Sequence, residues 1–185
     1  MKNYLILFIT ILFVACQQKQ EKPIESIEVL YYNGIFDRAM AVGCDEIIYL
    51  PEKVDTLDVL REDGSYVIKE AIILESIITD KKVLEEIAIE LGKRKVTKED
   101  YMDARMKCYI LFANKQRDSL CIGSGSIYGN YNGQPVKLTN RLVYLIRKNC
   151  GFYRWIGISE FPYFDELNDT TFVREKVISC FGEEY

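Results

Sequence analysis

The order of apolar and polar residues along the chain predicts short strands joined by tight turns. Runs rich in β-branched and aromatic residues occupy residues 26–32, 36–42, 56–61, 65–73, 107–113, 119–122 and 135–138. Turn residues such as Asn33-Gly34, Glu62-Asp63-Gly64 and Asn114-Lys115 separate neighbouring runs. The chain is therefore expected to form several antiparallel hairpins, one of which joins residues 107–113 to residues 119–122.

Three other segments carry apolar residues at helical spacing. The first begins at a cap formed by Thr79 or Asp80 and ends at Gly92. The second begins at Thr139 or Asn140 and ends near residue 149. The third, over residues 170–181, would place these side chains in the core: Phe172, Val173, Val177, Cys180 and Phe181.

Hairpins mixed with three helices, without strict alternation of strand and helix, indicate an α+β fold. We expect a single domain with a mainly antiparallel sheet, about three helices, and the helices packed on one face. The alternative is an α/β arrangement that includes some parallel strands.

The N-terminal residues have the pattern of a signal peptide. Lys2 gives a positive start, and residues 4–15 are almost entirely apolar. This apolar run is much shorter than the ~20 residues that a transmembrane helix needs. Residues 1–15 are therefore predicted to be a signal peptide, residues 16–25 a polar tether, and residues 26–185 the folded domain.

The stretch Phe13-Val14-Ala15-Cys16 resembles the lipobox of bacterial lipoproteins. The resemblance implies cleavage after Ala15 and acyl chains on Cys16, which would hold the protein at a membrane. Gln17 resembles the residue that follows the cysteine in lipoproteins sorted to the outer membrane, facing the periplasm or the cell surface. Two alternatives stay open, namely an ordinary cleaved signal peptide with a coincidental cysteine and a short core helix.

Composition excludes several functions. The chain has no histidine, which removes Ser-His-Asp and Cys-His catalysis and all histidine metal sites. Its formal net charge is −4, without a long basic stripe, so no nucleic-acid partner is expected. No CxxC pair is present, and we expect neither a metal nor a cofactor.

Besides Cys16, the chain has five cysteines, and an exported protein could form disulfides among them. Cys108 and Cys121 flank the predicted turn at Asn114-Lys115 and are a possible pair. A register shift of one residue would put them on opposite faces of the sheet. The alternative is that these cysteines are buried, free and serve as small apolar residues.

Two segments could contact a ligand. Residues 123–133 are rich in Gly, Ser, Asn and Tyr, as in adaptable recognition loops, with Tyr128 and Tyr131 as contact residues. A phosphate cradle is a second interpretation of this segment, and a pair of turns joining strands is a third.

Residues 159–169 mix carboxylates with aromatic residues. Glu160 and Asp165, or Glu166, could form the carboxylate pair of a glycosidase. Trp155 and Tyr163 could then support a sugar ring. The same residues could instead form a non-catalytic binding strip, or a surface loop whose aromatic residues pack into the core.

We therefore expect a membrane-tethered lipoprotein with a non-catalytic domain that binds a protein or a glycan. An immunity-type or inhibitor protein would be one form of this hypothesis, by fold-level analogy only. The alternatives are a structural accessory protein of the cell envelope and a carboxylate-dependent glycan hydrolase.

Overall fold

The computed structural model describes residues 23–32, 42–47, 55–60, 66–71, 73–99, 102–125 and 127–185. Within them, seven strands form one sheet in the order β4-β1-β6-β7-β8-β9-β5, and every neighbouring pair is antiparallel. Their bounds are β1 Ile24–Tyr32, β4 Ile73–Ile78, β5 Lys95–Val96, β6 Ala104–Phe112, β7 Arg117–Gly123, β8 Tyr128–Tyr131 and β9 Gln134–Lys137. A separate two-stranded sheet pairs β2 (Asp55–Leu60) with β3 (Tyr66–Ala71). The predicted α+β class with a mainly antiparallel sheet is confirmed.

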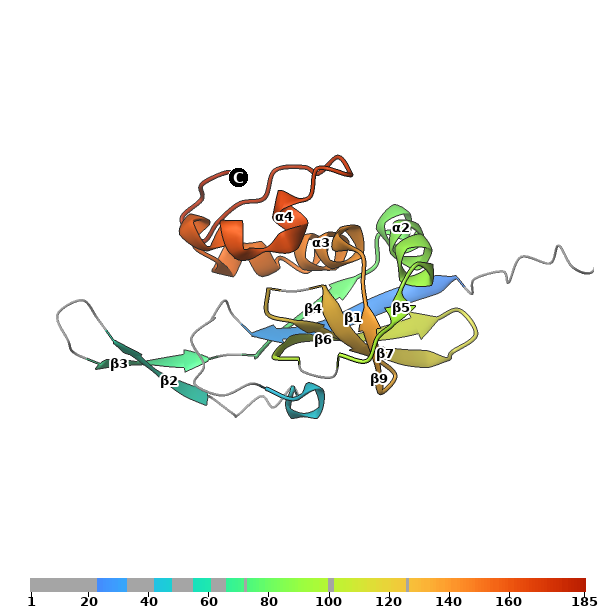
Figure 1. The fold of residues 1–185 in the computed structure, drawn as a ribbon, viewed down its shortest axis with the longest axis horizontal. Helices are drawn as coiled ribbons and strands as arrows, with labels where there is room; N and C mark the ends of the chain where they lie inside the picture. Colours follow the sequence, from blue (N-terminus) through green and yellow to red (C-terminus); the bar gives the residue numbers. More distant parts are fainter. Residues whose placement is uncertain are drawn as a thin grey trace, which may run out of the picture.

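The helices α2 (Lys81–Gly92), α3 (Asn140–Asn149) and α4 (Asp165–Asn168) lie on one side of the main sheet (Figure 1). Asp80 caps α2 by accepting hydrogen bonds from the backbone nitrogens of Lys82 and Val83, at 2.9 and 3.1 Å. Thr139 caps α3 in the same way through the nitrogen of Leu142. Two predicted helices and the one-sided arrangement are thus confirmed.

The main core fills the space between this face of the sheet and the helices. Side chains alternate across each strand, so β1 contributes Ile27, Val29 and Tyr31, and β6 contributes Met106, Cys108 and Ile110. The helices contribute Leu84, Ile87, Leu142 and Ile146, among others. A smaller cluster, Leu30, Tyr32, Val42, Ile47 and Ala104, covers part of the opposite face.

A disulfide joins Cys44, in the 3-10 helix η1 (Cys44–Glu46), to Cys121 of β7, with the Cα atoms 5.9 Å apart. The predicted Cys108–Cys121 pair is therefore wrong. The register of β6 and β7 sets Cys121 opposite Lys107, and Cys108 opposite Leu120, which turns the two thiols to opposite faces. Cys108 is a free, buried core residue, as the alternative interpretation expected.

The third predicted helix is wrong, because residues 169–177 form an irregular extended segment and residues 177–185 a short hairpin. The segment is rich in Thr, Val and Ile, whose branched side chains disfavour helix. Phe172 and Val177 do pack against the core, but Val173 and Phe181 are exposed. Strands β5 and β8 were not predicted, and β4 was not predicted as a separate strand.

The predicted signal peptide, Cys16 and most of the tether lie outside the described residues, as do residues 36–41 of one predicted strand. β1 begins at Ile24, so the last two residues of the predicted tether belong to the sheet. None of the helices in the described ranges is long and apolar enough to cross a bilayer.

Candidate binding surface in the C-terminal segment

The chain after α3 forms an outer layer above that helix, built from two 3-10 helices, η2 (Phe152–Trp155) and η3 (Ile158–Tyr163), and from α4. The rings of Phe152, Tyr153, Phe161 and Phe164 pack edge to face, with centroids 5.8 to 6.0 Å apart. Such pairs add to the stability gained from burying the rings. They give the layer a rigid base.

A buried ion pair holds this layer to the rest of the domain. Arg147 of α3 and Glu166 of α4 are both fully buried, and their Nη1 and Oε1 atoms lie 2.5 Å apart. Arg147 Nη2 also donates to the carbonyls of Gly123 and Ser124 at the end of β7. Removing either charge would leave its partner buried without compensation, so the pair locks α3, α4 and β7 into one arrangement.

Residues 177–185, here called the C-terminal hairpin, project from this layer. Val177 and Tyr185 exchange backbone hydrogen bonds at 3.2 and 3.0 Å. At the tip, Ser179 Oγ accepts from the backbone nitrogens of Phe181 and Glu183, at 3.3 and 3.1 Å. The Cys180 nitrogen donates to the Ile156 carbonyl and joins the hairpin to the layer. The tip is therefore held in one conformation by several bonds.

Three large apolar side chains are exposed around this hairpin, and we call them the apolar rim: Trp155, Ile178 and Phe181, which are 47%, 46% and 80% exposed. The ring of Phe181 lies beside Gly157, since a Cβ atom added to this glycine would be 4.0 Å from the ring. Ile178 lines a cavity together with Arg154, the neighbour of Trp155. Aromatic side chains that are exposed on a rigid support are typical anchors of protein interfaces.

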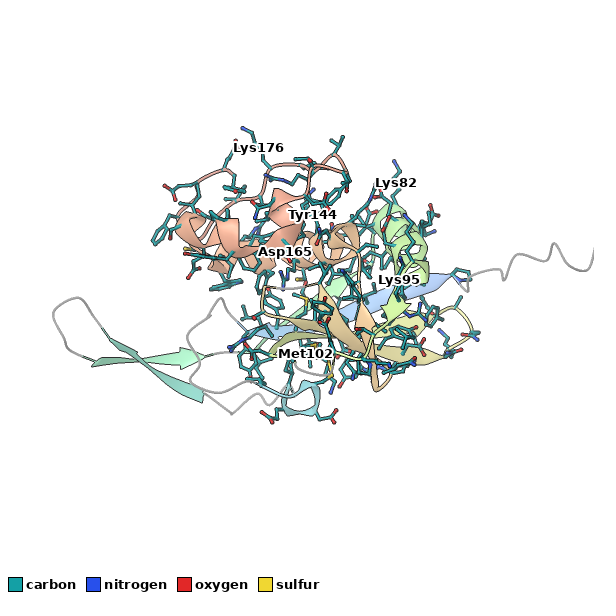
Figure 2. The ribbon with its side chains drawn as sticks, viewed as in Figure 1. Lys82, Lys95, Met102, Tyr144, Asp165 and Lys176 are labelled. Atoms are coloured by element: carbon teal, nitrogen blue, oxygen red, sulfur yellow. A yellow bond between two sulfur atoms is a disulfide. The ribbon has the colours of Figure 1, made fainter. Side chains whose placement is uncertain are left out.

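The cavity beside the apolar rim has a volume of about 140 Å³ and is lined by Lys148, Gly151, Tyr153, Arg154, Lys176, Val177 and Ile178. Figure 2 shows Lys176 on the outer side of the layer, away from the sheet. Lys148 pairs with Glu175, and Lys176 with Glu184 at 2.7 Å. In the described part of the chain, Arg154 has no carboxylate within ion-pair distance. No carboxylate is among the lining residues, so the cavity is cationic.

Tyr153 forms one wall of this cavity and is almost fully buried. Its hydroxyl donates to Glu166 Oε1 at 2.8 Å. Burial, and then the negative charge of Glu166, raise the pKa of Tyr153 well above its usual value. The phenol therefore stays protonated at neutral pH, and its hydrogen bond to Glu166 holds the side chain in place at the side of the cavity.

The predicted contact residues Tyr128 and Tyr131 lie in strand β8, so the expectation of an irregular loop over residues 123–133 is wrong for this part. Tyr128 donates to Glu99 at 3.3 Å, and Tyr131 donates to Asp118 while the guanidinium of Arg94 stacks on its ring. Both tyrosines are half-buried and far in sequence from the cavity. The interpretation as turns joining strands describes the segment best.

The predicted carboxylates do not converge on the cavity. Glu160 accepts a hydrogen bond from the Gly157 nitrogen at 3.2 Å, Asp165 is exposed at the start of α4, and Glu166 is paired with Arg147. This arrangement gives no support to a glycosidase pair. The side chains of Trp155 and Tyr163 are exposed in this layer, whereas Phe161 and Phe164 of the same segment are buried in the core.

The cationic residues of the cavity were not predicted, because in the sequence each is an ordinary surface charge, and they meet only where the hairpin packs against η2. Phe181 was predicted to lie on the buried face of a helix, whereas its side chain is exposed at the hairpin tip. Gly182, which would have ended the predicted third helix, lies instead in the turn of the C-terminal hairpin, with a φ of +80°. No family model, curated protein or solved structure matches the chain.

Proposed function

We propose that the protein is a lipid-anchored protein of the bacterial cell envelope, and that its C-terminal layer binds a partner protein. The observation that carries the binding role is the apolar rim, whose Phe181 is 80% exposed at the tip of a hairpin held by several hydrogen bonds. Exposing such a side chain has no benefit for folding, whereas a fixed aromatic anchor lowers the entropy lost on binding. The exposed aliphatic Ile178 favours a protein over a glycan.

The export of the domain is supported by two independent features. The lipobox-like stretch ends at Cys16, and the Cys44–Cys121 disulfide suits an oxidising compartment outside the cytoplasm. Only residues 17–23 separate Cys16 from β1, a tether that can reach at most about 25 Å. The proposed location is the outer membrane, with the domain facing the periplasm or the cell surface.

A binding role agrees better than catalysis with the chemistry of the cavity. Lysine and arginine side chains are protonated at neutral pH, and so is Tyr153. The lining side chains therefore offer positive charge and hydrogen-bond donors, but they offer no general base. Such a set recognises an anionic group rather than activating a nucleophile.

The test introduces a photo-crosslinking amino acid at Phe181 in the cells that produce the protein. A matched control places the same amino acid at Ile89, which is 58% exposed on α2. We expect a discrete crosslinked protein at position 181 and none at position 89. Equal crosslinking at both positions, or none at 181, would refute the binding role.

The anchor is tested separately by mass spectrometry of the native N-terminus. We expect acyl chains on Cys16 and no residue before it. An intact Met1 or an unmodified thiol would refute the anchor and leave the binding role standing.

A further inference from the structure

We infer that the cationic cavity beside the apolar rim seats a carboxylate of the partner protein, which deepens the proposed function and depends on it. Lys148, Arg154 and Lys176 line a space of about 140 Å³, large enough for the end of an aspartate or glutamate side chain. The three cations come from α3, η2 and the segment before the hairpin. They meet only in the folded domain, although the whole chain carries a net charge of −4.

The charge balance of the cavity favours a carboxylate over a phosphate. Lys148 and Lys176 are paired with Glu175 and Glu184. Among the three cations of the cavity, Arg154 therefore supplies the one charge that has no carboxylate partner among the described residues. This single charge matches a carboxylate, whereas a phosphate dianion would bring two. Arginine also fits a carboxylate well, since its guanidinium can donate two parallel hydrogen bonds.

Glu175 and Glu184 compete only weakly with the partner's carboxylate for the two lysines of the cavity. The side chains of Glu175 and Glu184 are 81% and 58% exposed, and water screens such pairs. A partner that covers the cavity would exclude water and strengthen the attraction between its own carboxylate and the cations. Burial of the site by the partner would therefore add to the attraction that the cavity exerts by itself.

The neighbouring apolar residues define the rest of the ligand. Val177 and Ile178 form the apolar part of the cavity, and Phe181 stands on the adjoining hairpin. A segment that fills the cavity and covers the apolar rim needs a carboxylate next to an apolar side chain. We therefore expect an acidic residue, flanked by large apolar residues, in the partner.

The experiment titrates the ¹⁵N-labelled full-length protein in detergent micelles with N-acetyl-glutamate N-methylamide. The neutral glutamine analogue and inorganic phosphate are titrated in parallel. We expect saturable shifts of the Gly151 and Ile178 amide signals with the glutamate probe, and at least fivefold weaker binding of the other two probes. Equal binding of the glutamine analogue, stronger binding of phosphate, or no saturable shift would each overturn the inference.

Variants localise the effect. The double variant Arg154→Gln/Lys176→Gln is expected to weaken binding of the glutamate probe at least fivefold, and Lys82→Gln, on α2 (Figure 2), to leave it unchanged. Arg154 and Lys176 are exposed, so the double variant should keep the melting temperature of the parent. Unchanged probe binding in the double variant would place the site elsewhere. Crosslinking at position 181 is also measured in the double variant. If crosslinking persists and the glutamate probe never binds, the carboxylate inference is refuted and the proposed binding of a partner protein is not.

Discussion

Removal of the Cys44–Cys121 disulfide should lower the stability of the domain by several kcal/mol. The bond closes a loop with a sequence separation of 77 residues. The chain-entropy relation gives about 4.5 kcal/mol for a loop of this length, and measured effects are commonly ~2–4 kcal/mol. For a domain of this size, that loss corresponds to a fall in melting temperature of roughly 10 °C. The cause is the larger conformational freedom of the unfolded chain once the loop is open.

The variant Cys44→Ser is the better perturbation, because Cys44 is only partly buried whereas Cys121 is fully buried in the sheet. Thermal unfolding by circular dichroism is measured with and without a reductant. We expect the reductant to lower the melting temperature of the parent to that of Cys44→Ser, and to have no effect on the variant. The matched control Cys180→Ser removes an exposed, free thiol and should behave as the parent. Identical melting temperatures of parent and Cys44→Ser under oxidising conditions would refute the reasoning.

Three further predictions concern the outer layer and the core. Glu166→Gln should cost about 3–5 kcal/mol of unfolding free energy in urea titrations, since it leaves the buried arginine of α3 unpaired, while the exposed Asp165→Asn should have almost no effect. Burial raises the pKa of Cys150 to about 12, so native alkylation at pH 8.5 followed by mass spectrometry should label Cys180 and spare Cys150. The Cys150 thiol ionises more readily in the unfolded chain, so the unfolding free energy should fall as the pH rises from about 9 towards 12. Phe181→Ser should change the unfolding free energy by less than about 0.5 kcal/mol and still abolish partner binding, and a large loss of stability would show that the side chain is structural.

The parts of the fold that depend on local signals could be predicted from the sequence. Capping residues and one apolar stripe were sufficient for α2, and the turn residues at Asn114-Lys115 were sufficient for the hairpin of β6 and β7. The predicted third helix failed because its apolar spacing fitted a helix while its branched residues disfavoured one. Tertiary packing of Phe172 and Val177 then decided the outcome.

The candidate site could not be predicted in the same way, because it depends on contacts between distant residues. Cys44 and Cys121 are 77 residues apart in the sequence, so no local pattern encodes their pairing. Lys148 and Lys176 meet at the cavity only because the chain turns back after α4. Of the apolar rim, only Trp155 was predicted as a contact residue, because it lies close to the segment that mixes carboxylates with aromatic residues.

Strand β1 links the two ends of the proposed mechanism. Its first residue follows the tether, and near its other end the Tyr31 hydroxyl donates to the carbonyl of Cys150, directly beside the cationic cavity. From Ile24 to Tyr31 an extended strand rises about 23 Å. With β4 and β6 paired on its two sides, this strand would act as a stiff spacer between the proposed lipid anchor and the contact residues, while the tether before it sets how far the domain reaches from the bilayer. Shortening the tether would then change how far the protein can reach, without altering what it recognises.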